Sequence, residues 1–172
     1  MGSRDNIWEG KNGSLFFSFA LKHKDLPNDL ALQSASIYFS YILKDILQSA
    51  GSTVWLKWPN DFYIKDKKIG GTITTITSDL ILCGIGLNLV NTNEKFGVLD
   101  IKINIDKILT QYFQAIKKYP TWKQIFSKFE IEFYEGNSFK VNIDNEKILL
   151  KDTKLQKDGS LLVDGKKVFS LR

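Results

Sequence analysis

Hydrophobic residues in the first third of the chain form one short run typical of a strand and one long run typical of a buried helix. The aromatic-rich segment 13–21 is short enough to be a buried strand. A break at residues 26–29 precedes a helix that we expect to run to about Ser49, with Asn28 or Asp29 as its N-cap. Apolar side chains lie nearly all round this helix, so it should be deeply buried.

The next part of the chain has the pattern of consecutive strands followed by helices. Residues 72–77 are all β-branched, which strongly favours a strand. We expect strands at 54–58, 62–64, 69–77 and 80–90, with a polar turn at 65–68. Two helices should follow, an amphipathic one at 105–118 and another at 121–132.

From about Gly136 short strands alternate with turn residues. The expected strands are 139–141, 148–150, 161–163 and 168–169, and the expected turns are 144–145, 158–159 and 164–165. This pattern predicts a small β-barrel or β-meander that packs on the first domain, because so short a segment has little core of its own. The chain should therefore be an α+β protein with domains at 1–133 and 134–172.

Composition supports a folded protein of a reducing compartment. Hydrophobic residues make up 43% of the 172 residues, which is enough to build a core. The single cysteine, Cys83, lies in an apolar run, so we expect a buried core residue and no intramolecular disulfide. No apolar run approaches the roughly 18–20 residues of a membrane span, and no secretory signal is visible. We expect a cytoplasmic protein without a membrane partner.

The net charge of +5 lies mostly in the second half of the chain and could attract nucleic acid or an acidic protein. Of the 24 basic residues only Arg4 and Arg172 are arginine. Because arginine makes the commonest specific contacts to bases, sequence-specific nucleic-acid recognition is not expected. An arginine retained among so many lysines can mark a need for planar, bidentate geometry.

The run Lys57-Trp58-Pro59-Asn60-Asp61 is the first candidate for chemistry. A lysine between a strand and an X-Pro turn has a restricted backbone, so its ammonium should point in a defined direction. Such a cation can neutralise a carboxylate or a phosphate as negative charge develops. The amide and carboxylate that follow can bind ligands or magnesium. The alternative is a surface lysine in a polar turn.

Glycines form a second candidate, with Gly70 and Gly71 in one expected strand and Gly84 and Gly86 in the next. Glycine within a strand often marks close approach of a ligand or of another backbone. Two such pairs could form a floor for a flat ligand, whereas bulges or tight packing are the alternative. Neither pair is followed by a helix, which excludes a dinucleotide-binding fingerprint.

A third candidate is the N-terminal run from Gly2 to Trp8. A flexible loop carrying Ser3 and Arg4 could fold over an anion, and Trp8 could cover an apolar ligand. By itself the run could equally be a cloning remnant followed by a loop.

In this order the three runs resemble the biotin–protein ligase family. The family has a loop of the form G-R-G-R-x-x-x-x-W, then K-W-P-N-D, K-[IL]-G-G and G-I-G-[IL]-N, and it ends in an SH3-like barrel that closes on a G-E-[VI]-S-L-R-like run. The matching segments are 2–8, 57–61, 68–71, 84–88 and 167–172. The resemblance thus spans essentially the whole chain.

The resemblance implies a core like that of class II aminoacyl-tRNA synthetases, a mixed, largely antiparallel sheet flanked by helices, with a small SH3-like barrel. It implies a ligase that makes biotinyl-5′-AMP from biotin and MgATP. The biotin then passes to a lysine of a biotin carboxyl carrier protein. It also allows a homodimer, and without a helix-turn-helix segment it implies no repressor role.

The family's site residues carry over position by position. Lys57 and Arg4 would be catalytic, with Lys57 touching the biotin carboxylate and the α-phosphate, and Asn60 and Asp61 would be candidate Mg²⁺ ligands. Arg172 would face the active site or brace the domain interface. The implied biotin-binding set is Gly2, Ser3, Arg4, Trp8, Lys57, Gly70, Gly71, Gly84 and Gly86. The implied ATP-binding set is Lys57, Asn60, Asp61, Asn88 and Arg172.

Departures from the family pattern shape what we expect of this chain. Ser3 stands where the family has the second loop arginine, with Arg4 one place later, and Thr75 stands where a glutamate is common. The family's segment before the loop, with a Ser-Thr-Asn run and a glutamine that contact biotin, has no counterpart here. Either Met1 is an internal methionine mistaken for a start, or the gene product is truncated. In both cases we expect the chain as written to be a core that lacks its N-terminal part and binds biotin and ATP weakly.

Two alternatives stay open at this point. One is a lipoate–protein ligase or octanoyltransferase, which shares the core fold but lacks K-W-P-N-D. The other is a non-catalytic remnant that folds and has lost part of the biotin site.

Overall fold

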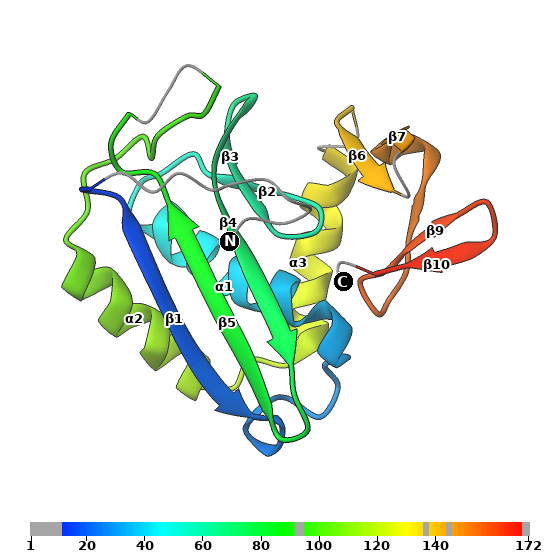
Figure 1. Cartoon of the computed structure of the whole chain (residues 1–172), viewed down its shortest axis with the longest axis horizontal. Coiled ribbons are helices and arrows are strands. Elements are labelled where there is room, and N and C mark those ends of the chain that lie inside the picture. The colour runs from blue at the N-terminus through cyan, green and yellow to red at the C-terminus, as the bar shows by residue number, and fades with distance from the viewer. Residues whose placement is uncertain (1–11, 92–94, 136–137, 144–145, 170–172) are drawn as a thin grey trace.

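The computed structural model describes residues 12–91, 95–135, 138–143 and 146–169. Its centre is a five-stranded sheet in the order β1-β5-β4-β3-β2, and every pairing among the described strands of this sheet is antiparallel (Figure 1). Tight connections join β2 to β5 in sequence, so these strands form a meander, to which β1 adds as an edge strand. The strands are β1 Leu15–Lys22, β2 Trp55–Lys57, β3 Asp61–Ile64, β4 Lys67–Ile76 and β5 Leu80–Leu87.

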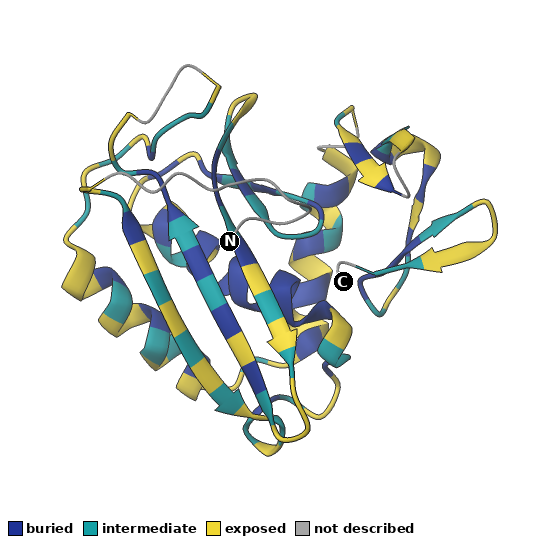
Figure 2. Ribbon diagram, in the orientation of Figure 1, coloured by how far each residue is buried: buried dark blue, intermediate teal, exposed yellow. Residues whose placement is uncertain are grey.

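The long helices pack on one face of this sheet (Figure 1). They are α1 Ala35–Ser49, α2 Ile105–Lys117 and α3 Trp122–Glu135. Phe17 and Phe19 of β1 point into this layer, where their ring centroids lie 5.6 and 5.9 Å from that of Tyr112 in α2. Alternate residues of the same strands face the other way and are exposed or half-buried (Figure 2). The α+β class expected from the sequence is confirmed.

The expected start of the first helix is wrong. A short 3-10 helix at Leu32–Ser34 comes first, and α1 begins at Ala35. Asp29 caps a different helix, because its two carboxylate oxygens accept hydrogen bonds from the backbone N–H groups of Trp122 (2.9 Å) and Lys123 (3.0 Å). These N–H groups open α3 and have no partner within the helix, so a carboxylate brought from elsewhere in the chain satisfies them.

The C-terminal part forms two small antiparallel sheets beside α3 (Figure 1). One pairs β6 Lys140–Ile143 with β7 Glu146–Leu149, and the other has the order β10-β9-β8, with β8 Lys154–Leu155, β9 Leu161–Val163 and β10 Lys166–Val168. The strand β8 was not expected from the sequence, because a strand of two residues has no alternation of apolar and polar positions. The turns at 158–159 and 164–165 form as expected, with positive φ at Gly159, Asp164 and Gly165.

Both parts of the chain share one hydrophobic cluster. Leu155 and Leu161 of the small sheets belong to the same buried cluster as Leu56 and Phe129. The expected boundary at 133/134 falls in the last turn of α3, which ends at Glu135. Burial raises the pKa of the Cys83 thiol, in keeping with the core position expected for it. No helix within the described residues has the length and apolarity needed to cross a membrane.

Candidate functional site

Residues from the separate motifs lie in one row across the sheet. Lys57 of β2 is opposite Asp61 of β3, Asp61 is opposite Gly71 of β4, and Gly71 is opposite Gly86 of β5. Directly opposite residues of antiparallel strands point to the same face. All four are half-buried, whereas their sequence neighbours such as Phe62 are buried towards the helices. The row therefore lies on the face of the sheet that the helices leave open (Figure 2).

Lys57 is held at the end of this row by an aromatic ring. Its Nζ lies 3.5 Å from the hydroxyl oxygen of Tyr63 and 5.3 Å from the centroid of the Tyr63 ring. Burial lowers the pKa of Lys57, while the Asp61 carboxylate opposes this shift and the Lys68 ammonium adds to it. Burial, with a further contribution from Asp61, raises the pKa of Tyr63 to about 12. The ammonium is thus directed and partly desolvated, as expected of a cation that contacts a reacting anion.

Sequence reasoning missed Tyr63. Its signal is its position on β3, two residues after Asp61, which places it on the same face of the sheet in a regular strand. The register between β2 and β3 is regular, with Trp55 opposite Tyr63 and Lys57 opposite Asp61, so this alternation was the available signal.

The polar residues after Pro59 hold the backbone of the site together. The side-chain amide of Asn60 donates to the carbonyl oxygen of Thr72, and the Asn60 carbonyl accepts from the Thr72 N–H at 3.0 Å. The Asp61 carboxylate accepts from Lys68 Nζ and forms an ion pair with it. The described residues contain no cluster of three His, Cys, Asp or Glu side chains that could hold a metal ion. Asn60 and Asp61 thus contact protein groups, and their role as Mg²⁺ ligands stays a prediction.

The glycines of the site differ in what surrounds them. A Cβ built on Gly70 would lie 2.3 Å from the carbonyl oxygen of Gly86, so tight packing of β4 against β5 accounts for this glycine. At Gly71 the nearest atom to such a Cβ is an Asp61 carboxylate oxygen at 3.1 Å, and at Gly84 it is only Ser18 Oγ at 3.4 Å. Gly84 therefore has room beside it for a ligand to approach the backbone, and Gly71 is bordered by the polar groups of Asp61, Asn60 and Lys68.

Asn88 fixes the far end of β5. Its side-chain amide donates to the Gly97 carbonyl at 3.2 Å, and its own carbonyl accepts from the Leu99 N–H at 2.9 Å. The side-chain oxygen of Asn88 is buried and has no hydrogen-bond partner within the described residues. A buried acceptor of this kind can bind a donor from a ligand.

The remaining expected site residues cannot be added to the row. Gly2, Ser3, Arg4 and Trp8, as well as Arg172, lie outside the described residues. Thr75 lies on β4, exposed and further along the strand from Gly71.

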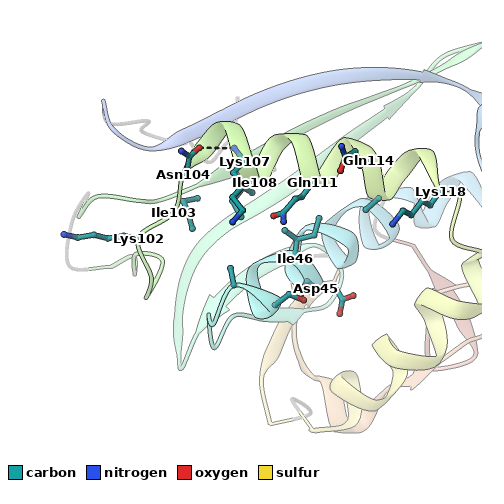
Figure 3. Close-up of a pocket in the computed structure, with 13 residues that line it drawn as sticks. Asp45, Ile46, Lys102, Ile103, Asn104, Lys107, Ile108, Gln111, Gln114 and Lys118 are labelled. Carbon is teal, nitrogen blue, oxygen red and sulfur yellow. Dashed lines mark hydrogen bonds between the residues drawn. The ribbon is translucent and has the colours of Figure 1, made fainter.

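A separate hollow of about 600 Å³ lies between α1 and α2 on the helical side of the molecule (Figure 3). Lys102, Lys107 and Lys118 give it a positive rim, with Asp45 on the opposite wall. Asn104, which caps α2 by accepting from the Lys107 N–H at 3.0 Å, also lines it. No residue of the row across the sheet lines this hollow, so it is not part of the candidate site.

Comparisons with known proteins all find biotin ligases or the family that includes them. Residues 1–88, just over half of the chain, match the model of the biotin/lipoate A/B protein ligase family. Biotin–protein ligase 2 of Arabidopsis thaliana is 35% identical over an alignment of 100 positions, which covers 52% of this chain and 30% of that protein. The matched stretch thus spans less than a third of the length of this curated relative.

Solved structures share the fold over nearly the whole chain. The crystal structure of biotin acetyl coenzyme A carboxylase synthetase from Helicobacter pylori, with bound biotinylated ATP, is 39% identical with a TM-score of 0.91, over 98% of this chain and 80% of that one. Biotin protein ligase from Aquifex aeolicus, in complex with biotin and ATP, has a TM-score of 0.69 over 96% of this chain and 78% of that one, and at 22% identity it supports the fold alone. On these grounds the chain belongs to the biotin/lipoate A/B protein ligase family.

Proposed function

We propose that this protein is an ATP-dependent biotin–protein ligase. It joins biotin to the AMP part of ATP and then transfers biotin to a lysine of a biotin carboxyl carrier protein. The main observation behind this proposal is the row of site residues on the face of the sheet that the helices leave open. This row begins at Lys57 and continues over Gly71 and Gly86. The names of the similar proteins, which include biotin–protein ligases, support the same activity.

The proposed chemistry has two steps. In the first, a biotin carboxylate oxygen attacks the α-phosphorus of ATP, and pyrophosphate leaves. In the second, the ε-amine of the carrier lysine attacks the biotinyl carbonyl, AMP leaves, and the amine proton passes to solvent. The Lys57 ammonium would stabilise the negative charge that develops between the carboxylate and the α-phosphate. Gly71 and Gly84 would let the ligand lie against the backbone, and Asn88 would offer its free oxygen to ATP.

The test is direct. The purified chain is incubated with labelled ATP, biotin and a biotin carboxyl carrier domain, and the products are separated. Labelled biotinyl-AMP and a biotinylated carrier are expected. Adenylate without carrier labelling would limit the function to activation of biotin. If neither product forms and biotin does not bind, the proposal is wrong.

A lipoate–protein ligase is the second candidate, because the matching family model includes lipoate ligases. Octanoate and lipoate, added in place of biotin in the same assay, distinguish the two. Biotin should be preferred, since similar proteins at 35% and 39% identity carry biotin in their names. Adenylation of lipoate or octanoate at a higher kcat/KM would reverse the assignment. A remnant without catalysis would bind biotin and form no product.

The pH dependence of adenylation should show two opposite shifts. The Lys57 cation is required, so activity should fall as pH rises through the lowered pKa of Lys57. Asp61→Asn removes the charge that raises this pKa, so the alkaline limb should move to lower pH. Lys68→Met removes the charge that lowers it, so the limb should move to higher pH. The measurement is kcat against pH for the three chains; shifts in the same direction would refute this electrostatic arrangement.

The two neighbouring glycines of β4 should respond differently to alanine. Gly70→Ala places a methyl group against the backbone of β5 and should lower the free energy of unfolding by about 1–3 kcal/mol. In Gly71→Ala the nearest atom to the new methyl group is an oxygen of the Asp61 side chain at 3.1 Å, and the nearest backbone atom, the Asn60 carbonyl oxygen, is at 3.6 Å, so the chain should fold and lose biotin affinity. Urea denaturation and calorimetric titration with biotin measure the two effects. If biotin affinity in Gly71→Ala equals that of the parent, Gly71 has only a packing role.

Other parts of the assignment follow from the same proposal. We infer a cytoplasmic location because ATP is required and Cys83, the one cysteine, is a buried free thiol. The edge strand β1 could pair with a second copy, so a homodimer is an assembly to test by sedimentation. We also propose that the segment after α3 is a C-terminal domain of the SH3-like kind.

A further inference from the structure

The turn between β8 and β9 binds the core of the molecule through three successive backbone carbonyls. The Lys157 carbonyl accepts from the indole N–H of Trp122 at 2.8 Å. The Asp158 carbonyl accepts from the Ser34 hydroxyl, and the Gly159 carbonyl accepts from the indole N–H of Trp58 at 2.9 Å. The three donors come from α3, from the 3-10 helix before α1 and from the proline turn after β2. One turn of the C-terminal part therefore contacts three separate elements, including the K-W-P-N-D segment.

The shape of this turn is fixed by its own residues. Gly159 has a φ of +82°, and a Cβ built on it would lie 2.8 Å from Ser34 Oγ. The Asp158 carboxylate accepts from Ser160 N–H at 3.1 Å, from Ser160 Oγ at 2.6 Å and from Lys167 Nζ at 2.8 Å. Burial alone would raise the pKa of Asp158, but the hydrogen bonds from Lys167 and Ser160 outweigh it and lower the pKa. The carbonyls are thus presented in a braced conformation.

The same C-terminal part also touches the other side of the β2–β3 hairpin. The Phe139 ring lies 4.7 Å from Trp55 and 5.8 Å from Tyr63, centroid to centroid. Tyr63 in turn carries the Lys57 ammonium over its ring. The hairpin that bears Lys57 is therefore held on one face by Phe139 and on the other by the carbonyl of Gly159.

We propose that residues of the C-terminal part position Lys57 for catalysis, with the Trp58–Gly159 hydrogen bond as the principal contact and the Phe139–Tyr63 contact as the second. Trp58 directly follows Lys57, and its indole is 5% exposed, so no solvent replaces the Gly159 carbonyl if the bond is lost. Trp58 and Gly159 are positioning residues in this arrangement, and Lys57 is the catalytic one. The inference rests on the proposed ligase function.

The chain contains a matched pair of tryptophans for the test. Trp58 and Trp122 are both 5% exposed, and both donate an indole N–H to the same turn, but only Trp58 adjoins Lys57. Replacing each by phenylalanine removes the donor and keeps an aromatic ring. Trp58→Phe should lower kcat for adenylation at least about tenfold, with KM for biotin within about twofold, since a small displacement of a catalytic group has a large effect on rate. Trp122→Phe should leave both constants within about twofold of the parent.

A second measurement needs no turnover. The titration of Lys57, followed by NMR of ¹³C-labelled lysine in the ligand-free chain, should move towards ordinary lysine behaviour in Trp58→Phe and stay unchanged in Trp122→Phe. Phe139→Leu, which acts through Tyr63, should also shift the titration of Lys57. This variant tests the positioning role if Trp58→Phe does not fold. Equal effects of the two tryptophan variants, or an unmoved Lys57 resonance, would overturn the positioning role. A parent chain that forms no adenylate would refute the ligase proposal. The Lys57 resonance would still show whether the C-terminal part positions Lys57.

Discussion

Replacing Lys57 by alanine should slow the formation of biotinyl-AMP by a factor of about 10²–10³ while the chain stays folded. Lys57 is half-buried and ends the row of site residues, with its ammonium 3.5 Å from the Tyr63 hydroxyl oxygen. The loss of a preorganised charge contact typically costs about 3–4 kcal/mol in the transition state, which corresponds to this factor. Release of pyrophosphate from ATP and biotin gives the rate.

Two controls separate this role from a general effect of charge. Lys22→Ala removes an exposed lysine at the end of β1 and should leave the rate unchanged. Lys57→Arg keeps the positive charge but replaces a point cation by a planar one, so an intermediate rate is expected. Biotinyl-AMP formation by Lys57→Ala at the parent rate would mean that the ammonium takes no part in adenylation.

The substitution Glu132→Gln should lower the free energy of unfolding by about 3–5 kcal/mol, because it leaves a buried ammonium without its counter-charge. Lys44 of α1 is 1% exposed and forms an ion pair with Glu132 of α3, whose side chain is 17% exposed. The Lys44 ammonium also lies 4.0 Å from the ring centroid of Tyr41. Burial, with the nearby Glu132 carboxylate, raises the pKa of Tyr41, which therefore stays neutral beside the pair. Urea denaturation measures the loss.

An exposed ion pair between the same two helices is the matched control. Asp45 and Lys128 lie 3.8 Å apart, with side chains 51% and 61% exposed. Asp45→Asn should change stability by less than about 1 kcal/mol, since surface pairs contribute little. The double substitution of Lys44 by Met and Glu132 by Leu should recover most of the stability, because apolar side chains of similar size fit a buried site. A Glu132→Gln chain as stable as Asp45→Asn would show that Lys44 does not need its partner.

The pattern of apolar and polar residues correctly predicted the helices and strands that depend mainly on their own sequence. The β-branched run at 72–77 lies largely within β4, and the amphipathic run from Ile105 became α2 to within one residue of its expected end. The predicted start of α1 was wrong because the sequence around Asp29 does not show which helix this residue caps. Only in the folded chain does Asp29 lie beside Trp122 at the start of α3. The strand β8 has too few residues for a pattern. Secondary-structure propensity thus located most helices and strands, but it could not show which distant residues contact them.

The candidate site divides in the same way. Its motif residues could be found from the sequence, and antiparallel pairing of neighbouring strands brings Lys57, Asp61 and Gly71 together. Tyr63 was missed although its place two residues after Asp61 on β3 puts it on the same face as Lys57. Gly159 could not be found, because its role depends on a turn 101 positions from Trp58. The separate role of Gly70 also required coordinates, since only the distance to the Gly86 carbonyl distinguishes it from Gly71.

The carboxylate of Asp29 links the start of α3 to a distant part of the polypeptide, in addition to the local cap that Thr121 and Gln124 provide. It supplies the acceptors for the first N–H groups of α3 from a position 93 residues before Trp122. Peptides cut anywhere between residues 30 and 121 would separate α3 from the Asp29 carboxylate, leaving the N–H groups of Trp122 and Lys123 to solvent at the start of the helix. Fragment complementation should therefore restore more helicity in the C-terminal piece when the N-terminal piece carries Asp29. An N-terminal piece with Asp29→Ala, compared by circular dichroism, should restore less of it.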